Sequence, residues 1–266
     1  MTTSQSRPPA PTPSSHTTRA HSFNAAAAQY AANRPSYPPA LLDAVEEEAG
    51  RSLTGATAVD VGAGTGIATA LLHARGADVL AVEPGEGMAA QFRATFPDIP
   101  IVRGDGNALP LAADTADFLT YAQAWHWTDT ARSVPEALRV LRPGGALALW
   151  WNTTPLDVDW IAAQDDRLSR FFGVATAAEK RGTADRTDLA DPSGRLRFTR
   201  REVRWSRRVS VDTHLANIGS HSAFLVIPEA RRTAFLAEER SHLLKAFPDE
   251  VVEETYDVLL LVARND

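Results

Sequence analysis

The chain has 266 residues, of which 44% are hydrophobic and 23% charged, and its formal net charge is -6. This length fits one large domain or one domain with a small cap. The acidic balance argues against a nucleic acid as main partner, because binding to a phosphate backbone needs a basic surface. Disulfides, thiolate zinc sites and cysteine nucleophiles are excluded, since the sequence contains no cysteine.

Residues 1–20 are rich in proline, serine and threonine and contain no apolar stretch. We therefore expect a disordered N-terminal tail here and no secretory signal. No apolar run approaches the ~20 residues that span a bilayer. With an alanine- and arginine-rich composition, these features favour a cytoplasmic, bacterial protein without a membrane partner.

The remainder, 21–266, is expected to form a single domain that begins with a lid over 21–50. Alanines favour a helix from Phe23 to Tyr30, which Pro35 interrupts. A second helix is expected at Pro39–Ala49, since proline stands near its start and Gly50 follows its end.

Strands and helices then alternate. Short apolar runs predict five strands, at Ala56–Val61, Asp78–Glu83, Ile99–Arg103, Ala116–Gln123 and Ala146–Asn152. Amphipathic segments between them predict helices at Ile67–Arg75, Gly87–Phe96 and Thr130–Leu141. This alternation is typical of a parallel sheet with helices on both faces.

The regular alternation of strands and helices ends after Asn152. The pattern predicts a helix at Asp157–Phe172, a polar, loop-rich segment at Thr176–Arg195, a strand at Phe198–Val209, a mostly helical stretch at Val211–Phe247 and a last strand at Thr255–Arg264. We therefore expect an α/β, Rossmann-like fold with a mostly parallel seven-stranded sheet. Insertions at 153–195 and 211–247 would form a small helical cap over the sheet edge where ligands bind.

The most specific motif is Asp60-Val-Gly62-Ala-Gly64-Thr-Gly66, which lies between the first expected strand and its helix. Glycines there allow a tight turn and bring the backbone close to a ligand beside a helix N-terminus. A simple strand-to-helix turn is the plainer alternative.

The glycine spacing is G-x-G-x-G, whereas dinucleotide enzymes have G-x-G-x-x-G. Their cofactor brings a pyrophosphate, beside which an acid at Asp60 would sit poorly. S-adenosylmethionine instead carries a cationic ammonium and a sulfonium, which Asp60 suits directly or through water. The motif therefore favours the sulfonium cofactor, while a dinucleotide-dependent oxidoreductase remains the alternative.

Glu83 ends the second expected strand, 17 residues after Gly66. An acid at this place can accept hydrogen bonds from both ribose hydroxyls of a nucleoside. The alternative is an exposed carboxylate at a strand end. Met88 is a candidate contact for the adenine face, or an ordinary core methionine.

With this turn, Glu83, Asp105 and Leu141-Arg-Pro-Gly-Gly145 in order, the chain resembles the class I S-adenosylmethionine-dependent methyltransferases. The resemblance is most marked from Phe23 to Asn152 and looser beyond. It implies methyl transfer to a small molecule with S-adenosylhomocysteine as product. No metal site is expected. Use of the cofactor for cyclisation of its aminobutyl arm is a second reading.

The resemblance also implies roles for single residues. In the family, the first-strand acid and the glycines surround the methionine part of the cofactor. An acid after strand three contacts the adenine, and the segment after strand four borders the transferable methyl. These roles fall on Asp60, Gly62, Ala63 and Gly64, on Asp105 with Gly106 and Asn107, and on Gln123.

Two further segments, Tyr30-(x3)-Arg34-Pro-Ser-Tyr37 and Gln123-Ala-Trp-His-Trp127, are similar to a branch that includes trans-aconitate methyltransferase. By that resemblance Tyr30, Arg34 and Tyr37 belong to a lid. Arg34 would hold an acceptor carboxylate or the cofactor's own, or only cap a helix. The chain has Ser220-His221-Ser222 where the branch often has Ser-Trp-Ser, so an acceptor cannot be carried over.

If the acceptor must lose a proton, histidine is the natural base. His126 and His221 are the candidates, and each has the alternative of a structural hydrogen bond. Trp125, Trp127 and Trp160, with Tyr37 and His221, are candidates for the acceptor pocket, although aromatic residues at such places often belong to the core.

The arginine-rich segment Arg200–Arg208 is interpreted as the solvated edge of a sheet. Contact with an anionic substrate or RNA is the alternative. The chain is expected to act as a monomer or homodimer.

Overall fold

The computed structural model describes residues 33–176 and 190–265. The expected tail, the helix at Phe23–Tyr30 and the candidate residue Tyr30 lie outside these ranges.

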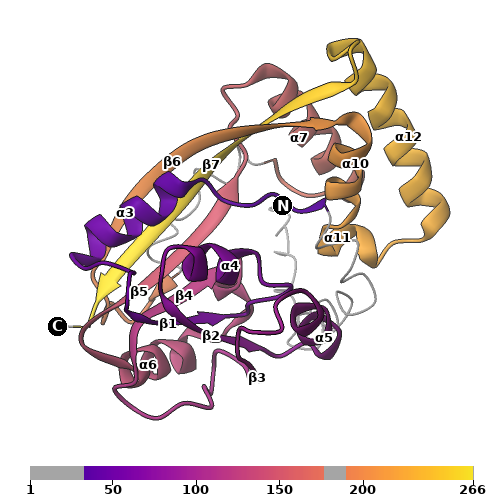
Figure 1. Cartoon of the computed structure of the whole chain (residues 1–266). Helices are drawn as coiled ribbons and strands as arrows, with labels where there is room; N and C mark the ends of the chain where they lie inside the picture. Colours follow the sequence, from indigo (N-terminus) through magenta and orange to yellow (C-terminus); the bar gives the residue numbers. More distant parts are fainter. Residues whose placement is uncertain (1–32, 177–189, 266) are drawn as a thin grey trace, which may run out of the picture.

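The strands form one seven-stranded sheet in the order β3-β2-β1-β4-β5-β7-β6 (Figure 1). Its members are β1 (Thr57–Val61), β2 (Asp78–Glu83), β3 (Ile101–Arg103), β4 (Ala116–Ala122), β5 (Leu141–Thr153), β6 (Phe198–Ser210) and β7 (Val251–Arg264). The first five pair in parallel, whereas β7 is antiparallel to both β5 and β6. The prediction of a mostly parallel sheet is confirmed.

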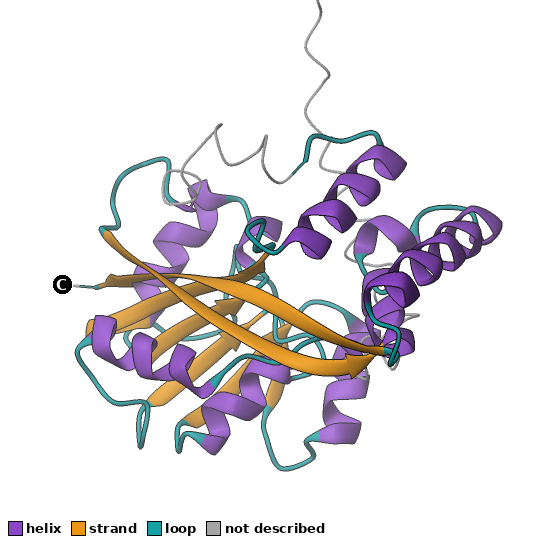
Figure 2. Cartoon of the chain, turned by 90° about the horizontal axis from the view of Figure 1, so that it is seen from above, coloured by secondary structure: helices purple, strands orange, loops and turns teal. Residues whose placement is uncertain are grey.

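Helices cover both faces of the sheet (Figure 2). One face packs against α3 (Pro39–Ala49), α4 (Ile67–Ala74) and α5 (Glu86–Thr95), and the other against α6 (Thr130–Val140) and the short 3-10 helix η2 (Trp125–Trp127). Alternate residues of β5 enter the two cores, so that Ala148 and Trp150 face one and Leu147 and Leu149 the other. A strand buried on both faces is therefore apolar at successive positions.

The antiparallel strands β6 and β7 are longer than their neighbours. They pair along their full length, from Phe198 with Ala263 to Ser210 with Val251, whereas β5 pairs only with residues 257–264 of β7. Residues 205–210 and 251–256 therefore form a two-stranded ribbon that extends beyond the sheet (Figure 1).

The ribbon reaches four helices, α7 (Asp159–Phe172), α10 (Val211–Gly219), α11 (Ser222–Leu225) and α12 (Glu229–Ala246). They lie together at one end of the molecule (Figure 1) and have two small apolar clusters of their own. This group is the helical cap that the sequence predicts.

Most boundaries differ from expectation by one or two residues, but β5 and β7 are longer. β5 begins at Leu141 because this residue already pairs with Ala116 on β4, before an irregularity in the register. β7 begins at Val251 because it pairs with β6 beyond the sheet. None of the helices within the described ranges is long and apolar enough to cross a membrane.

Leu149→Ala tests the packing of the core on the face of the sheet that α6 covers. The side chain is fully buried, and its truncation leaves a cavity, so we expect the free energy of unfolding to fall by about 2–5 kcal/mol in urea denaturation. Val174→Ala is the control, because Val174 is 51% exposed and should change stability by less than about 0.5 kcal/mol. If the two substitutions lowered the free energy of unfolding equally, the buried position of Leu149 would be contradicted.

Candidate functional site

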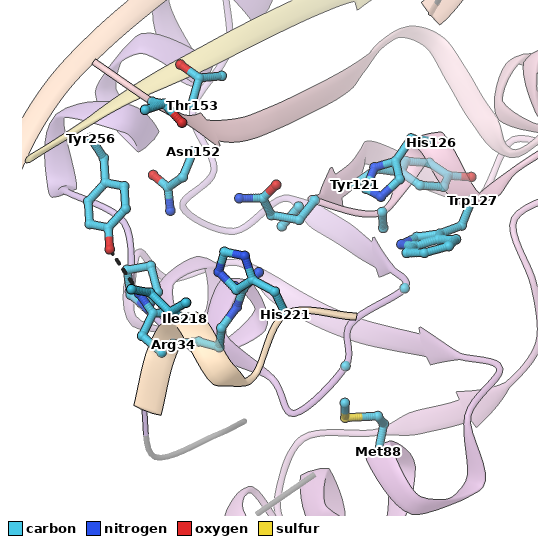
Figure 3. A pocket seen from close by; sticks show the side chains of 18 of the residues that line it. Arg34, Met88, Tyr121, His126, Trp127, Asn152, Thr153, Ile218, His221 and Tyr256 are labelled. Atoms are coloured by element: carbon cyan, nitrogen blue, oxygen red, sulfur yellow. Dashed lines mark hydrogen bonds between the residues drawn. The ribbon is translucent and has the colours of Figure 1, made fainter. Parts of the chain in front are cut away.

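A cavity of about 740 Å³ lies at the carboxyl ends of the parallel strands, between the sheet and the cap (Figure 3). Open α/β sheets bind ligands at this edge. One wall, which we call the sheet side, consists of Gly62, Gly64, Glu83, Met88, Asp105, Gly106, Asn107 and Gln123. The opposite wall, the cap side, consists of Arg34, Asn152, Trp160, Gln164, His214, Asn217, His221, Glu254 and Tyr256.

Most of the residues that the sequence singles out lie in this lining. They are Arg34, Gly62, Gly64, Glu83, Met88, Asp105, Gly106, Asn107, Gln123, His126, Trp127, Trp160 and His221. Because they come from segments far apart in the chain, the fold brings the predicted motifs together at one edge of the sheet.

Tyr37 and Trp125 do not line the cavity, contrary to expectation. Tyr37 is buried in the core, where its ring stands edge-on to Trp150 at 5.9 Å. Trp125 is buried on the other face, and its indole nitrogen donates to the carbonyl of Ala190 at 2.9 Å. Trp127, two residues later on the same 3-10 turn, does reach the cavity.

Asp60 also lies behind the cavity wall, as does Ala63, which packs against the core. The Asp60 side chain is fully buried and accepts hydrogen bonds from the hydroxyls of Thr69 at 2.6 Å and Thr120 at 3.1 Å. Burial raises its pKa to about 6, and these hydrogen bonds oppose the shift. In this structure Asp60 therefore links β1 to α4 and β4 beneath the glycine turn.

Glu83 links the two turns of the sheet side. One carboxylate oxygen accepts from the Gly64 amide at 2.8 Å and the other from the Gly85 amide at 2.6 Å. The side chain is buried and lines the cavity, and burial raises its pKa against these two bonds. A carboxylate oxygen has two lone pairs, so each can accept one more hydrogen bond.

The glycine turn needs glycine for two different reasons. Gly62 and Gly64 have positive φ angles of 69° and 59°, which side chains rarely adopt. A Cβ on Gly62 would lie 2.6 Å from that of Ala124, whereas a Cβ on Gly64 would meet nothing within 4 Å. The absence of a side chain at Gly62 thus lets the turn after β1 pack closely against Ala124, after β4. At Gly64 the backbone stays accessible from the cavity.

The loop after β3 is held in place by its own side chains. Asp105 accepts from the Asn107 amide at 2.7 Å, and the Asn107 side chain accepts from the Asp129 amide at 2.7 Å. Asp105 itself is exposed, so its carboxylate remains accessible at the mouth of the sheet side.

Two features mark the end of β4. Gln123 has a φ of 58°, a conformation that costs energy for a residue other than glycine and often occurs at functional sites. The hydroxyl of Tyr121 is buried and has no hydrogen-bond partner among the described residues. Both residues belong to the cavity lining.

His126 accepts a hydrogen bond rather than offering a base. The indole nitrogen of Trp151 donates to its Nδ1 at 3.3 Å, and because indole N–H is only a donor, Nδ1 must be unprotonated. The hydrogen of the neutral ring is then on Nε2. The exposed ring also contacts Trp127, with 4.8 Å between ring centres.

A cluster of buried polar residues on the cap side was not predicted from the sequence. Its centre is Glu254, which is 2% exposed. Its carboxylate accepts from Arg207 Nε and His214 Nδ1, both at 2.6 Å, and from Tyr256 Oη at 2.9 Å. Although burial alone raises its pKa, the hydrogen bond from His214 and the charges of His214 and Arg207 lower it to about 2.

His214 connects this cluster to a second group of buried polar residues. Gln164 donates its amide nitrogen to Glu239 at 3.2 Å, and Glu239 is the salt-bridge partner of Arg167. The Gln164 carbonyl therefore faces His214 Nε2, at 3.1 Å, while Nδ1 faces the Glu254 carboxylate. The two ring nitrogens of His214 therefore link Glu254 on β7 to Gln164 on α7.

His221 projects toward the middle of the cavity (Figure 3). Burial lowers its pKa, and the positive charges of Arg34 and His214 lower it further. His221 is therefore a neutral imidazole at pH 7. In the described ranges no three His, Asp or Glu residues are placed to hold a metal ion.

The arginine-rich segment forms β6, and its charges are paired. Arg201 pairs with Glu47 and Glu48, and Arg204 with Asp157 and Asp257. This supports the interpretation as a solvated edge for most of the segment. Arg207 differs, because its side chain lies on the inward face and joins the cavity cluster.

Comparison with known proteins identifies relatives across the chain. A family model described as a methyltransferase domain matches residues 59–149. An uncharacterized methyltransferase of Mycobacterium tuberculosis is 35% identical over 222 residues, which cover 84% of this chain and 85% of the relative. A solved structure from Anaeromyxobacter dehalogenans, described as a type II methyltransferase, is 26% identical with a TM-score of 0.65 and covers 87% of this chain and 98% of that one.

Glu254→Gln tests the ionised cluster on the cap side. Removing one partner of a buried charge pair should lower the free energy of unfolding by about 3–5 kcal/mol at pH 7. The folded pKa of about 2 lies below the ordinary 4.5, so the carboxylate stabilises the fold above about pH 4.5 and this contribution is lost as the pH falls toward 2. Urea denaturation at pH 7 and 3.5 should therefore show a smaller difference between the two proteins at the lower pH.

Glu253→Gln is the matched control, because Glu253 is exposed on the same strand. It should change stability by less than about 0.5 kcal/mol at either pH. A Glu254→Gln protein as stable as this control would contradict the cluster.

Proposed function

This chain belongs to the class I S-adenosylmethionine-dependent methyltransferases, and on that premise we propose that it transfers the methyl group to a small-molecule acceptor in the cavity. The cofactor supplies an activated methyl on a positively charged sulfur. The acceptor types that fit this chemistry are a carboxylate, hydroxyl, nitrogen or carbon nucleophile.

The single observation that carries the proposal is the position of Glu83. Its buried carboxylate faces the cavity and retains acceptor capacity toward a pair of hydroxyls, as a ribose presents. The backbone beside Gly64 is open, and Met88 and Asp105 lie on the same wall. These residues fit a nucleoside, with Glu83 holding the ribose and Asp105 available to an adenine amino group.

The cap side would receive the acceptor. The side-chain oxygen of Asn152 accepts from the Trp205 indole at 3.2 Å, so its amide nitrogen is a donor directed toward the cavity (Figure 3). Trp160 and His221 lie on the same wall. By fixing acceptor and methyl donor between two walls, the protein supplies alignment, which can contribute up to about 7–11 kcal/mol to lowering the barrier.

The two histidines do not favour general-base catalysis. Nδ1 of His126 already accepts from Trp151, and the lowered pKa of His221 makes it a weak base. The carboxylate of Glu254 is engaged and has a pKa of about 2. This arrangement favours an acceptor atom that carries no proton at neutral pH, such as a carboxylate oxygen or an unprotonated nitrogen.

The direct test is incubation of the protein with S-adenosylmethionine and a panel of carboxylates, phenols, amines and activated carbon acids, with products identified by mass spectrometry. We expect S-adenosylhomocysteine together with a methylated carboxylate, or with a methylated nitrogen that carries no proton at neutral pH. Methylthioadenosine without a methylated product would instead indicate cyclisation of the aminobutyl arm and would overturn the proposal. At about 100 times its dissociation constant, S-adenosylhomocysteine should also stabilise the fold by about 2.7 kcal/mol.

Glu83→Gln tests the ribose site separately. It keeps the shape of the side chain but replaces one charged acceptor oxygen by a donor, so the dissociation constant of S-adenosylhomocysteine should rise more than tenfold, measured by calorimetry. Glu86→Gln is the control, because Glu86 is exposed at the start of α5 and does not line the cavity. If the two variants bound S-adenosylhomocysteine with equal affinity, Glu83 would not be part of the ribose site.

A further inference from the structure

The segment that enters α3 crosses the cap side of the cavity. Arg34 and Pro35 belong to the cavity lining, and Figure 3 shows Arg34 beside Ile218, near Tyr256 and His221. The charge of Arg34 acts on both His221 and Tyr256: it adds to the lowering of the His221 pKa that burial causes, and it opposes the rise that burial causes in the pKa of Tyr256. The position of Arg34 therefore affects the wall assigned to the acceptor.

This segment is held by its main chain. Arg207, which lies on β6, donates from one terminal nitrogen to the carbonyl oxygen of Asn33 at 3.0 Å and from the other to that of Arg34 at 3.5 Å. A hydrogen bond to a carbonyl restrains the backbone itself. It thus fixes the place from which the Arg34 side chain enters the cavity.

Arg207 is itself fixed. Its Nε donates to Glu254, the residue opposite it in the pairing of β6 with β7, and its side chain is 23% exposed. Glu254 is in turn held by His214 and Tyr256. The guanidinium therefore joins a rigid buried cluster to a segment that is remote in sequence.

We propose that Arg207 is a positioning residue for the acceptor, because it docks the main chain at Asn33 and Arg34 and so places the Arg34 guanidinium on the cap side of the cavity. This inference rests on the proposed function for the identity of the reaction, but the docking itself does not. Arginine suits the role because its planar fork can satisfy one carboxylate and two carbonyls at once. Lysine would keep the charge beside Glu254 without this fork.

Two substitutions separate docking from charge, Arg207→Gln and Arg207→Lys. The control is Arg208→Gln, because Arg208 is the next residue, has a 73% exposed side chain and lies 4.0 Å from Asp249. Hydrogen exchange of the full-length protein, followed in the peptide that carries residues 33–37, reads the docking directly. Calorimetry with S-adenosylhomocysteine and steady-state kinetics with the best acceptor of the panel read its consequences.

We expect both Arg207 variants to increase exchange in residues 33–37 at least tenfold, while exchange in β1 and β4 is unchanged. The KM for the acceptor should rise at least tenfold. The dissociation constant of S-adenosylhomocysteine should stay within threefold, and Arg208→Gln should match the unaltered protein. If Arg207→Gln fails to fold, the lysine variant decides the question.

Three outcomes would overturn the proposal. The first is unchanged exchange at residues 33–37 in a folded Arg207 variant, and the second is full restoration of the segment by lysine. The third is weaker binding of S-adenosylhomocysteine with an unchanged acceptor KM, which would assign Arg34 to the cofactor. If no member of the panel is methylated, the proposed function fails, while the exchange experiment still decides the docking.

Discussion

The sheet side of the cavity depends on one buried carboxylate. Glu83 accepts hydrogen bonds from the amides of Gly64 and Gly85, and so it joins the turn after β1 to the turn after β2. A buried carboxylate is costly unless it is hydrogen-bonded, and two amides satisfy only part of its capacity. The Glu83 carboxylate therefore holds the two turns together and can still accept hydrogen bonds from a pair of hydroxyls. Asp60, which the sequence places first in the motif, supports the turn from beneath through Thr69 and Thr120.

The other wall depends on the antiparallel end of the sheet. Because β6 and β7 continue beyond β5, they carry Glu254 and Tyr256 to the cavity, where both contact the cap helix α10, and they place Arg207 beside Glu254. The cluster around Glu254 joins the strands to the cap helices through directional hydrogen bonds, and so it stabilises the cap side of the cavity. The polarity of this wall also depends on protonation states, with Glu254 ionised and His221 neutral at pH 7.

The sequence predicted well what is local. Alternating strands and helices, the glycine turn, and the acids that end β2 and follow β3 are all encoded within a few residues, and each was found at the expected edge of the sheet. The aromatic predictions were less reliable, because Trp125 and Trp127 lie on one short turn but only Trp127 lines the cavity, while Trp125 is buried in the core. The cap-side cluster was not predicted, since His214 and Glu254 meet only through the non-local pairing of β6 with β7. An available signal was that Glu254 and Tyr256 alternate in step with Val252 and Val258, which places an acid on the same face of the strand as two apolar residues.

The central claim is that the edge formed by Gly64 and Glu83 receives the ribose of a sulfonium nucleoside. A crystal structure with S-adenosylhomocysteine measures this most directly. The account predicts both ribose hydroxyls within about 2.5–3.0 Å of the Glu83 carboxylate oxygens and the sulfur directed toward His221 and Asn152. A nucleoside bound elsewhere, with Glu83 contacting only the amides of Gly64 and Gly85, would contradict it.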